Sequence, residues 1–574
     1  MRELATDILI LGSGGAGLFA ALHAHQAAPQ LSITIAVKGL LGKCGCTRMV
    51  QGGYNVALAP GDSIERHFMD TIEGGKWLPN QELAWKLVTL AIERIRELEN
   101  ELGCFFDRNP DGTVHQKAFA GQSFDRTVHK GDLTGIEIIN RLAEQVWARD
   151  IGRLEEHRAV ELIKARDEEA ISGVVFVDMR SGEYVLVRAK AVLLATGGGP
   201  TMYRYHTPSG DKSCDGLAMA LRAGLRLRDM EMVQFHPTGL LAGAHTRMTG
   251  TVLEEGLRGA GGYLLDANRE RFMHKYDSKL ERATRDIVSR AIFSEMRAGR
   301  VTPNGGVYIS MAHLGPDKVA QAFKGMVERC ADSGFDLAGG LVEVVPTAHY
   351  MMGGVEFAPD CASALPGLFV AGEDAGGVHG ANRLGGNGVA NSTVFGGVAG
   401  EAMAAWVAAQ GTLREPDREQ IDAARSRCER PFANKASARG GVEPAREALF
   451  DLMWHKVGII RDAAGLRSAL TELDAIETDL DACALADHNR AFNLSWHDWM
   501  NLKSLIEVSR VIAYAALARE DSRGAHFRDD FPHTGPLEAS RYTSARLAGR
   551  GVEIALRPVE FTRVRPGQSL LAAA

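Results

Sequence analysis

The sequence lacks the features that would place the protein within a membrane or on nucleic acid. No apolar run approaches the roughly 18 residues that a membrane-spanning helix needs. The formal net charge of −7 over 574 residues gives no reason to expect a nucleic-acid or anionic-membrane partner. The N-terminus runs into a strand-like segment without the basic and then apolar layout of a signal peptide. We therefore predict a cytoplasmic protein with no membrane span of its own and no nucleic-acid partner.

Cysteine is scarce and poorly spaced for metal binding. The eight cysteines include no C-x-x-C pair and no run of the kind that ligates zinc or an iron–sulfur cluster. Cys44 and Cys46 stand one residue apart, and this stretch alone could be half of a metal site, a redox pair or another use of sulfur. We predict no metal site, so any redox chemistry must come from an organic cofactor.

Glycine, by contrast, is abundant, with 64 residues that cluster in short loops. Such loops suggest a backbone held close to a ligand in several places. The first, in "TDILILGSGGAGLFAALHA", follows an apolar strand and opens an Ala-rich helix. Gly12, Gly14 and Gly17 form the G-x-G-x-x-G pattern of dinucleotide binding, with Gly15 in the same turn, and the helix N-terminus would receive the phosphates. The chain therefore begins with a predicted dinucleotide-binding unit.

Two further stretches favour FAD over NAD as the dinucleotide. The second strand ends at Val37 and Lys38, where an NAD-binding fold would place an acidic residue on the ribose. A later strand ends in "ATGGG", a turn also seen where FAD-binding folds close over the dinucleotide. A third strand, "GLFVAG", is followed by Glu373 and by a helix predicted from about Asn391, whose positive end could stabilise a reduced, anionic flavin.

The chain resembles the flavoprotein subunits of succinate dehydrogenase and fumarate reductase, and their relative L-aspartate oxidase. The resemblance runs from about residue 5 to 535, and its blocks include "GSGGAG", "VQGGYNVAL", "QFHPTG", "EEGLRGAGGYLL", "ATRDIVSRAI", "PTAHYMMGG", "HGANRLGGN" and "EDSRGAHFRDDFP". Members of this family commonly carry a pair such as Ser-Lys where Val37 and Lys38 stand here, which accounts for the missing acid.

The resemblance implies an α/β fold in three parts. A doubly wound, Rossmann-like FAD-binding domain would comprise residues 1–235 and 351–410. An α+β capping domain would be inserted at 236–350. A C-terminal helical domain and tail would occupy 411–574.

The resemblance also implies the residues around FAD and the substrate. The FAD ligands would be Gly12, Gly14, Gly15, Gly17, Lys38, Cys46, Thr47, Gln51, Gly52, Gly53, Ala195, Thr196, Gly197, Asp215, Glu373 and Asn387. The catalytic group would be Arg285 as the proton-transferring residue, Glu255 as its relay carboxylate, and His236, His349 and Arg383 as ligands of the substrate carboxylates. Phe119 corresponds to an aromatic residue near the substrate, although a packing role is equally consistent with it.

Two positions depart from the family pattern. Glu254 stands where relatives have a threonine that bonds a substrate carboxylate, so a substrate carboxylate would be repelled there unless Glu254 is protonated or turned away. Either the substrate presents a neutral, hydroxyl or cationic group to Glu254, or Glu254 points outward and the substrate is an ordinary dicarboxylate. Cys46 stands where a histidine links covalently to flavin in succinate dehydrogenases. We expect noncovalent FAD; the alternatives are a thioether to Cys46 and a Cys44–Cys46 disulfide or metal role.

The predicted function is interconversion of a succinate- and fumarate-like dicarboxylate pair, by hydride transfer at flavin N5 and proton transfer through Arg285. Electrons would leave FAD for another subunit, a quinone-linked complex, a soluble carrier or oxygen. If the chain is the electron-transferring flavoprotein subunit of a respiratory complex, a separate iron–sulfur subunit would dock on it, and it would reach the inner membrane only through partner subunits. The alternatives are an L-aspartate oxidase-like enzyme, which oxidises a C–N bond, and a non-catalytic flavin-binding protein.

Overall fold

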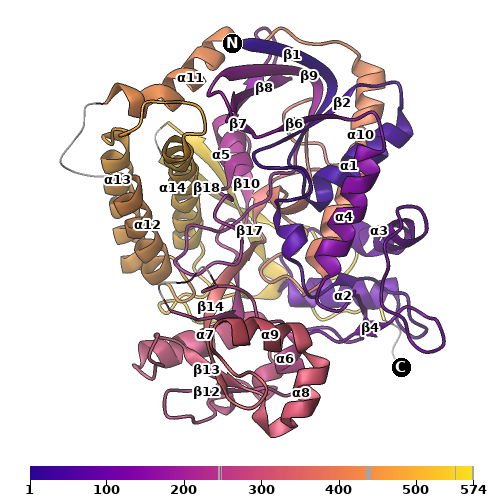
Figure 1. The fold of residues 1–574 in the computed structure, drawn as a ribbon, viewed down its shortest axis with the longest axis vertical. Coiled ribbons are helices and arrows are strands. Elements are labelled where there is room, and N and C mark those ends of the chain that lie inside the picture. Colours follow the sequence, from indigo (N-terminus) through magenta and orange to yellow (C-terminus); the bar gives the residue numbers. More distant parts are fainter. Residues whose placement is uncertain (244–245, 247, 435–440, 550, 572–574) are drawn as a thin grey trace.

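The structure is a computed structural model that describes residues 1–243, 246, 248–434, 441–549 and 551–571. A sheet with helices against it forms the upper body in Figure 1, four later helices lie along one side, and a smaller sheet with short helices forms the lower end. Among the described residues, no helix has both the length and the apolar character needed to cross a membrane.

The main sheet has seven strands and carries the N-terminal strand near its centre. Its strands are β1 (Arg2–Leu11), β2 (Ile33–Val37), β6 (Gly152–Glu155), β7 (His157–Lys164), β8 (Ile171–Asp178), β9 (Tyr184–Leu194) and β16 (Leu368–Val370). The order is β6-β2-β1-β9-β8-β7, and β16 also pairs with β9. All pairs are parallel except β7–β8 and β8–β9. The parallel core agrees with the predicted doubly wound architecture. The last four residues of β1, 8–11, are apolar and fully buried, as expected for a parallel strand covered on both faces.

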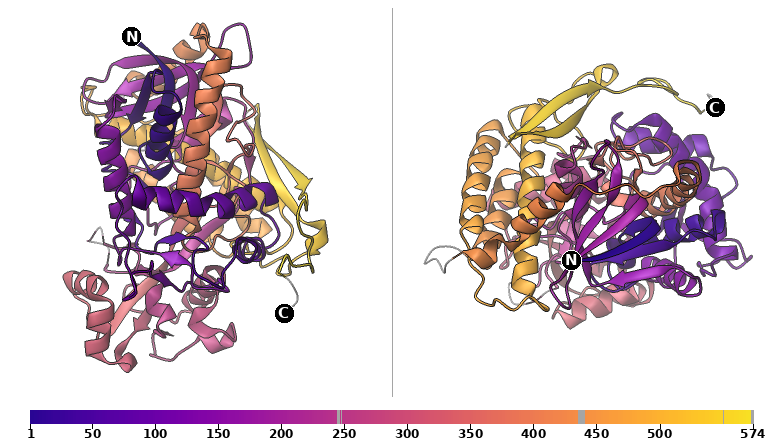
Figure 2. Two further views of the ribbon diagram at one scale, coloured as in Figure 1. Left: turned by 90° about the vertical axis from the view of Figure 1, so that its right-hand side faces the viewer. Right: turned by 90° about the horizontal axis from the view of Figure 1, so that it is seen from above.

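Two helices run side by side against this sheet, α1 (Gly15–Ala27) and α10 (Asn387–Gln410), as Figures 1 and 2 show. Small residues bring their backbones close together: a Cβ on Gly400 would lie 2.3 Å from the Ala20 carbonyl oxygen, and one on Gly396 would lie 2.6 Å from that of Ala16. The helix expected from about Asn391 begins earlier, at Asn387, because it also contains the turn that follows the "RLGG" loop.

The lower part is a four-stranded antiparallel sheet in the order β11-β14-β13-β12, covered by helices. Its elements are β11 (Val233–Leu240), α6 (Gly256–Gly259), β12 (Tyr263–Leu265), α7 (Arg285–Arg297), β13 (Val307–Ser310), α8 (Pro316–Ala322), α9 (Lys324–Asp332) and β14 (Leu341–Met351). The predicted domain boundaries at 235/236 and 350/351 fall inside β11 and β14. The chain therefore enters and leaves the lower part within these two strands.

The connections that complete the upper body are mainly helical. They are β3 (Tyr54–Asn55), α2 (Ile64–Gly74), α3 (Gln81–Asn100), β4 (Gln116–Lys117), β5 (Thr127–Val128), α4 (Thr134–Trp147), α5 (Asp215–Arg222), β10 (Leu227–Arg228) and β15 (Gly354–Val355). Strands β3, β5 and β4 form a small sheet of their own.

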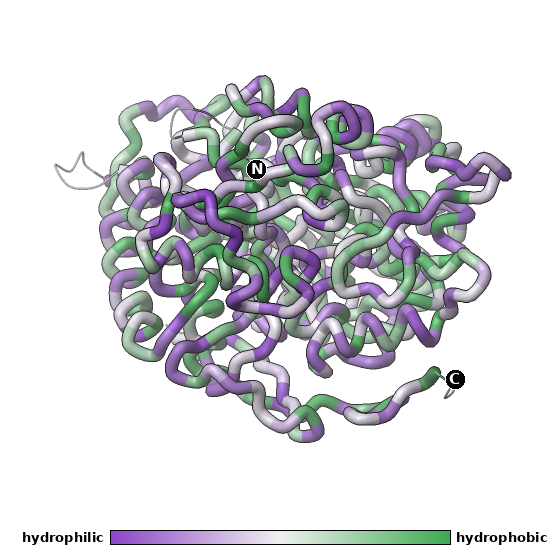
Figure 3. Tube along the Cα trace, turned by 90° about the horizontal axis from the view of Figure 1, so that it is seen from below, coloured by the Kyte–Doolittle hydropathy of each residue, from purple (hydrophilic) through white to green (hydrophobic). Residues whose placement is uncertain are grey.

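The chain beyond 411 is only partly helical. Helices α11 (Arg418–Ala433), α12 (Val442–Lys456), α13 (Ala463–Asp481) and α14 (Leu494–Ala518) pack together, as expected for the C-terminal helical domain. The tail, for which the sequence offered no secondary structure, contains the hairpin β17 (Arg541–Ala548) and β18 (Gly551–Pro558), whose first strand pairs with β10. In Figure 3 the last segment lies along the outside of the molecule, where Val564 packs in one cluster with Trp77.

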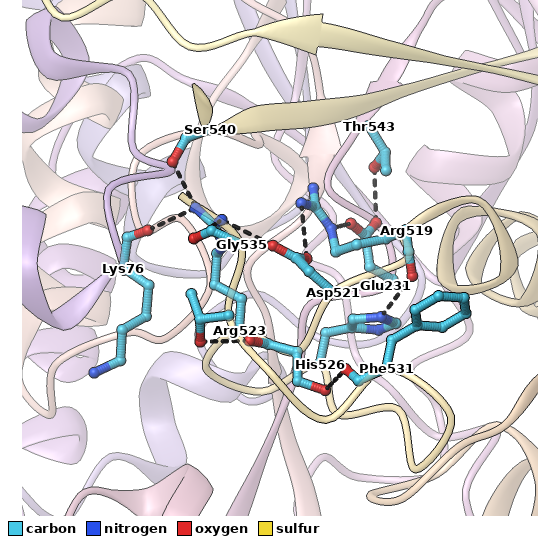
Figure 4. Close-up of polar contacts among 12 residues, drawn as sticks. Lys76, Glu231, Arg519, Asp521, Arg523, His526, Phe531, Gly535, Ser540 and Thr543 are labelled. Atoms are coloured by element: carbon cyan, nitrogen blue, oxygen red, sulfur yellow. Dashed lines mark hydrogen bonds and ion pairs between the residues drawn. The ribbon is translucent and has the colours of Figure 1, made fainter. Parts of the chain in front are cut away.

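A buried ionic network connects this tail to the upper body (Figure 4). Arg519 Nε donates to Glu231 Oε1 at 2.6 Å, and Thr543 Oγ1 donates to the other oxygen at 2.7 Å. Arg523 pairs with Asp521 at 2.8 Å and donates to the Ser540 hydroxyl at 2.5 Å. A buried charge that loses its partner costs several kcal/mol. The network therefore stabilises a single conformation of the "EDSRGAHFRDDFP" block.

We predict that Gly400→Ala destabilises the protein although alanine favours helices. The added methyl would overlap the α1 backbone, so the free energy of unfolding should fall by about 1–3 kcal/mol and thermal denaturation should show a lower midpoint. Gly259→Ala is the control, because a Cβ there meets no atom within 4 Å, and it should be neutral or stabilising by up to about 1 kcal/mol. Equal midpoints for both variants would show that the helix crossing is not constrained.

Candidate active site

A large cavity with an empty volume of about 1810 Å³ lies where the ends of the main-sheet strands meet β11, β14 and α7. Every predicted site residue except Gly17 and Asn387 lines it. Residues distant in sequence therefore meet around one cavity that opens to solvent, the kind of place where a ligand binds.

The glycine turn after β1 forms one end of the cavity. Gly12 has a φ of +108°, and a Cβ there would lie 2.2 Å from the Ala195 carbonyl oxygen. The N–H of Gly15 donates to Thr47 Oγ1 at 3.1 Å. Gly17 lies outside the cavity because its role is helix–strand packing: a Cβ would lie 2.0 Å from the Gly12 carbonyl oxygen. The turn is a cradle of the kind that accepts a pyrophosphate at a helix N-terminus.

Lys38 and Asp215 form an ion pair beside this cradle. Lys38 Nζ lies 2.9 Å from Asp215 Oδ2, and Arg158 lies 2.7 Å from Oδ1 of the same carboxylate. Burial raises the pKa of Asp215, but Arg158 and Lys38 outweigh it and hold the pKa below its ordinary value. Strand β2 has no acidic residue at its end, and Asp215, the first residue of α5, supplies a carboxylate at that position instead.

The loop after β16 supplies two carboxylates, the half-buried Glu373 and the fully buried Asp374. Glu373 accepts a hydrogen bond from the Met351 N–H at 2.9 Å, and burial raises its pKa to about 7. Asp374, which was not predicted from the sequence, accepts from the N–H groups of Thr196 and Gly197 at 2.5 and 3.2 Å. These bonds connect the end of β16 to the end of β9. The sequence could have indicated Asp374 as a site residue, because it directly follows Glu373 in "GED".

Asn387, which we predicted as a cofactor ligand, does not line the cavity. Its side-chain oxygen accepts from Asn55 at 2.8 Å and lies 2.9 Å from His67 Nε2, and its amide donates to Thr71 at 3.1 Å. These bonds fix the start of α10 against α2 and β3. A polar residue at the start of a helix is a candidate cofactor ligand, but the Asn387 side chain points to protein groups and away from the cavity.

Cys46 lies on the cavity wall in a short 3₁₀ turn, and both it and Cys44 are free thiols. The described residues contain no cluster of side chains that could hold a metal ion. Burial, assisted by Glu373, raises the pKa of Cys46 to about 12. The sulfur is therefore a protonated thiol at neutral pH, which makes it a weak nucleophile.

Arg285, the first residue of α7, is held by a carboxylate at the other end of the cavity. Its Nε and Nη2 donate to Glu255 Oε2 at 2.9 and 2.6 Å, and Arg258 Nη2 donates to Glu255 Oε1 at 3.2 Å. Burial raises the pKa of Glu255, but Arg285 and Arg258 lower it further than burial raises it. Arg258, one helical turn after Glu255, was not predicted from the sequence, although its i+3 spacing places it on the same face.

Gln234 connects the two guanidinium groups of the cavity and was also not predicted. Its Oε1 accepts from Arg285 Nη1 at 3.1 Å and from Arg383 Nη2 at 3.2 Å. Arg383 also lies over the Tyr350 ring, with 4.3 Å from its guanidinium carbon to the ring centroid. Gln234 stands two residues before His236 in β11, the period that places side chains on one face of a strand.

His236 and His349 lie close together in the cavity wall, with ring centroids 5.5 Å apart. The Thr238 N–H donates to His236 Nδ1 at 3.3 Å, so the proton of this ring is on Nε2. Burial, and then Arg285, hold the pKa of both histidines well below the ordinary value. Both rings are therefore neutral hydrogen-bonding groups at neutral pH.

Phe119 and Glu254 complete the end of the cavity that holds Arg285. A Cβ on Gly52 would lie 2.7 Å from the Phe119 ring, so the ring both lines the cavity and packs on the Gly52 loop. Glu254 is half-buried in the cavity wall rather than turned to solvent. Burial raises its pKa against the opposing effect of Lys117.

Comparison with known proteins agrees with this arrangement. An FAD binding domain family matches residues 7–389, and a fumarate reductase flavoprotein C-terminal family matches residues 446–570. One subunit of the fumarate reductase (CoM/CoB) of Methanothermobacter marburgensis is 39% identical over 92% of this chain and 95% of its own length. The fumarate reductase flavoprotein subunit of Escherichia coli is 34% identical over 92% and 89%.

Among solved structures, a single-residue variant of FrdA from the E. coli quinol fumarate reductase superposes with a TM-score of 0.92. The two chains are 32% identical, and the match covers 99% of each. The glycine cradle and the ion pair at the end of β2 both fit FAD. The chain therefore belongs to the succinate dehydrogenase and fumarate reductase flavoprotein family and is a flavin-dependent oxidoreductase that binds FAD.

Proposed function

We propose that this protein interconverts a succinate- and fumarate-like dicarboxylate pair by oxidation or reduction of the CH–CH bond. The observation that carries the proposal is the charge at the substrate end of the cavity. Three buried guanidinium groups, of Arg258, Arg285 and Arg383, lie around one carboxylate, Glu255, that bonds to two of them. With Glu254 protonated, the direction in which burial shifts its pKa, this arrangement leaves an excess of two positive charges, which equals the charge of a dicarboxylate dianion. The names of the matched relatives support the same reaction.

FAD would be held by the glycine cradle, by the Lys38–Asp215 pair and by the Cys46–Gly53 segment, and when bound it supplies hydride transfer at N5. The chain's own residues bind and orient the substrate. Arg383 forms no ion pair with any carboxylate among the described residues, and its Nε is buried without a partner. It is therefore available to a substrate carboxylate. The Nε2–H of His236 would also donate a hydrogen bond to a substrate carboxylate, and His349 lies beside it.

Proton transfer would be the role of Arg285. An arginine can exchange a proton only where burial and a carboxylate assist it, because its ordinary pKa is very high. Arg285 meets both conditions, since it is 9% exposed and two of its nitrogens bond to one Glu255 oxygen. Arg258 bonds to the other oxygen, and burial lowers its pKa, so the chain Arg258–Glu255–Arg285 is a continuous path for a proton.

We also propose that the protein works with a separate electron-transferring partner of the iron–sulfur type. The supporting observation is that relatives matched over nearly their whole length are named as subunits of fumarate reductases. Purification of the native complex would test this: the proposal expects an iron-containing polypeptide at a fixed ratio to FAD, and a fully active protein without one would contradict it.

A second candidate substrate class is favoured by Glu254. A carboxylate in the wall of a dicarboxylate site could pair with an ammonium group, as in an amino dicarboxylate oxidised at its C–N bond. Peroxide release with aspartate as the substrate would support this candidate, and turnover restricted to succinate or fumarate would exclude it.

We predict that Arg285→Lys and Glu255→Gln each lower kcat by about 100-fold or more, the usual contribution of a positioned acid–base group. FAD content should be unchanged, because neither residue belongs to the cradle. The measurement is steady-state fumarate reduction with a reduced dye. Arg290→Lys, on the same helix but outside the cavity wall, is the control. A lysine at 285 that retains full kcat would refute the proton-transfer role.

We predict that Glu254→Thr increases succinate or fumarate turnover, because it removes a carboxylate from the wall and leaves a hydroxyl donor. If the natural substrate is an amino dicarboxylate, its turnover should fall in the same variant. The measurement is kcat/KM for both substrates. An unchanged kcat/KM for succinate would show that Glu254 does not discriminate between these substrates.

We predict that the FAD is noncovalent, since the Cys46 thiol stays protonated. Precipitation in denaturant should leave a yellow supernatant and a colourless pellet, and Cys46→Ser should bind FAD as the natural protein does. A yellow pellet that becomes colourless in Cys46→Ser would instead establish a thioether.

A further inference from the structure

Gln234 occupies an unusual position, between two arginines that both face the cavity. It lies in β11 with 1% of its surface exposed, so its polar atoms depend entirely on protein partners. Its oxygen accepts one bond from Arg285 and one from Arg383, as described above. Its Nε2 donates to Asn382 Oδ1 at 2.9 Å and to the Arg383 carbonyl oxygen at 2.8 Å. All four hydrogen-bonding positions of the amide are therefore used.

The partners also fix the orientation of this amide. The Arg383 carbonyl oxygen can only accept, so the nitrogen of Gln234 must face it. A flipped amide would direct N–H groups at two guanidinium groups, which have no acceptor. The amide oxygen is therefore the group that lies between Arg285 and Arg383.

The neutrality of this group has a consequence for the two arginines. Two guanidinium groups repel each other, and burial together with Arg285 lowers the pKa of Arg383 to about 10. An amide oxygen holds both in place while leaving their charges intact. A carboxylate in the same place would neutralise one charge and would compete with the substrate for Arg383. It would also give Arg285 a second anionic partner besides Glu255.

We propose that Gln234 is a positioning residue that holds Arg285 and Arg383 side by side without neutralising either, and thereby sets the preference of the site for a doubly charged substrate. Arg285 stays bonded to Glu255 for proton transfer, while Arg383 keeps its charge for a substrate carboxylate. The inference rests on the proposed function, because it concerns the dicarboxylate selectivity of that same site.

The test compares Gln234→Glu and Gln234→Met in the FAD-loaded protein. Binding is followed by the change in the visible flavin spectrum during titration with fumarate, and with the monocarboxylate crotonate as the contrast. Gln234→Glu should weaken fumarate binding by about 10- to 100-fold, the effect of one opposing charge or one lost charged hydrogen bond. Crotonate binding should weaken much less, because one uncompensated charge remains. Gln234→Met should weaken fumarate binding about tenfold by releasing both arginines.

The pH profile separates a charge effect from a packing defect. In Gln234→Glu, fumarate affinity should recover as the pH falls through the pKa of the introduced carboxyl, because its protonated form resembles the amide. Gln234→Met should show no such recovery. The titratable and charged groups that act on the two arginines and shape the profile are Glu255, Arg258, His236, His349, Tyr350 and Glu373, and Glu373 has a pKa of about 7.

Gln81 offers a matched control outside the cavity wall. It is 2% exposed, and it bonds to the backbone of Val564 through both side-chain polar atoms, at 2.7 and 3.0 Å. Gln81→Glu and Gln81→Met should leave fumarate affinity and its pH profile unchanged even if they lower stability. Fumarate affinity in Gln234→Glu equal to that of the natural protein, or an equal loss for fumarate and crotonate at every pH, would overturn the role of Gln234. A natural protein that binds no dicarboxylate at all would overturn the proposed function as well.

Discussion

The arrangement of this protein depends on the close contact of α1 with α10. Helix α1 follows the glycine cradle, and α10 follows the loop that carries Arg383. Gly396 and Gly400 let the two helix backbones approach to distances that no side chain would permit. The contact therefore places the turn at residues 12–17 and the loop and helix start at residues 383–391 at the same end of the main sheet. This backbone constraint brings the cofactor end and the substrate end of the cavity into one continuous space.

Within that space the electrostatics are simple. The end that holds Arg285 is rich in cations, because Glu255 bonds to both Arg258 and Arg285 while Arg383 forms no ion pair among the described residues. The two histidines add hydrogen-bonding capacity without adding charge, since burial keeps them neutral. Buried positive charge without a partner is costly, so the folded protein holds this site at a cost that a dianionic substrate would offset. The neutral amide of Gln234 fits the same arrangement, as it bonds to two cations without reducing their charge.

At the end of the cavity beside the glycine cradle, positive and negative charges are paired within the protein. There the carboxylate that would assist the dinucleotide does not come from the end of β2 but from Asp215 on α5, paired with Lys38. The sequence showed only that an acid was missing after the second strand. The pairing was unpredictable from local pattern, because 177 residues separate the two members of the ion pair. Asn387 illustrates the opposite failure: the motif placed it correctly near the cavity, but packing turned its side chain to Asn55 and His67.

The FAD-binding architecture and the family could be predicted from the amino-acid pattern, and all of the predicted site residues except Gly17 and Asn387 line the cavity. Short-range patterns carry this information, since glycine turns and strand–turn–helix units need particular residues at fixed spacing. How those residues share charges and hydrogen bonds could be learned only from the folded chain. The bonds of Gln234 to Arg383, of Arg258 to the Glu281 carbonyl oxygen and of Asp374 to Thr196 became evident only in the folded chain, as did the hairpin that pairs with β10. These relations depend on contacts between segments far apart in the chain, and a linear pattern contains no record of which segments meet.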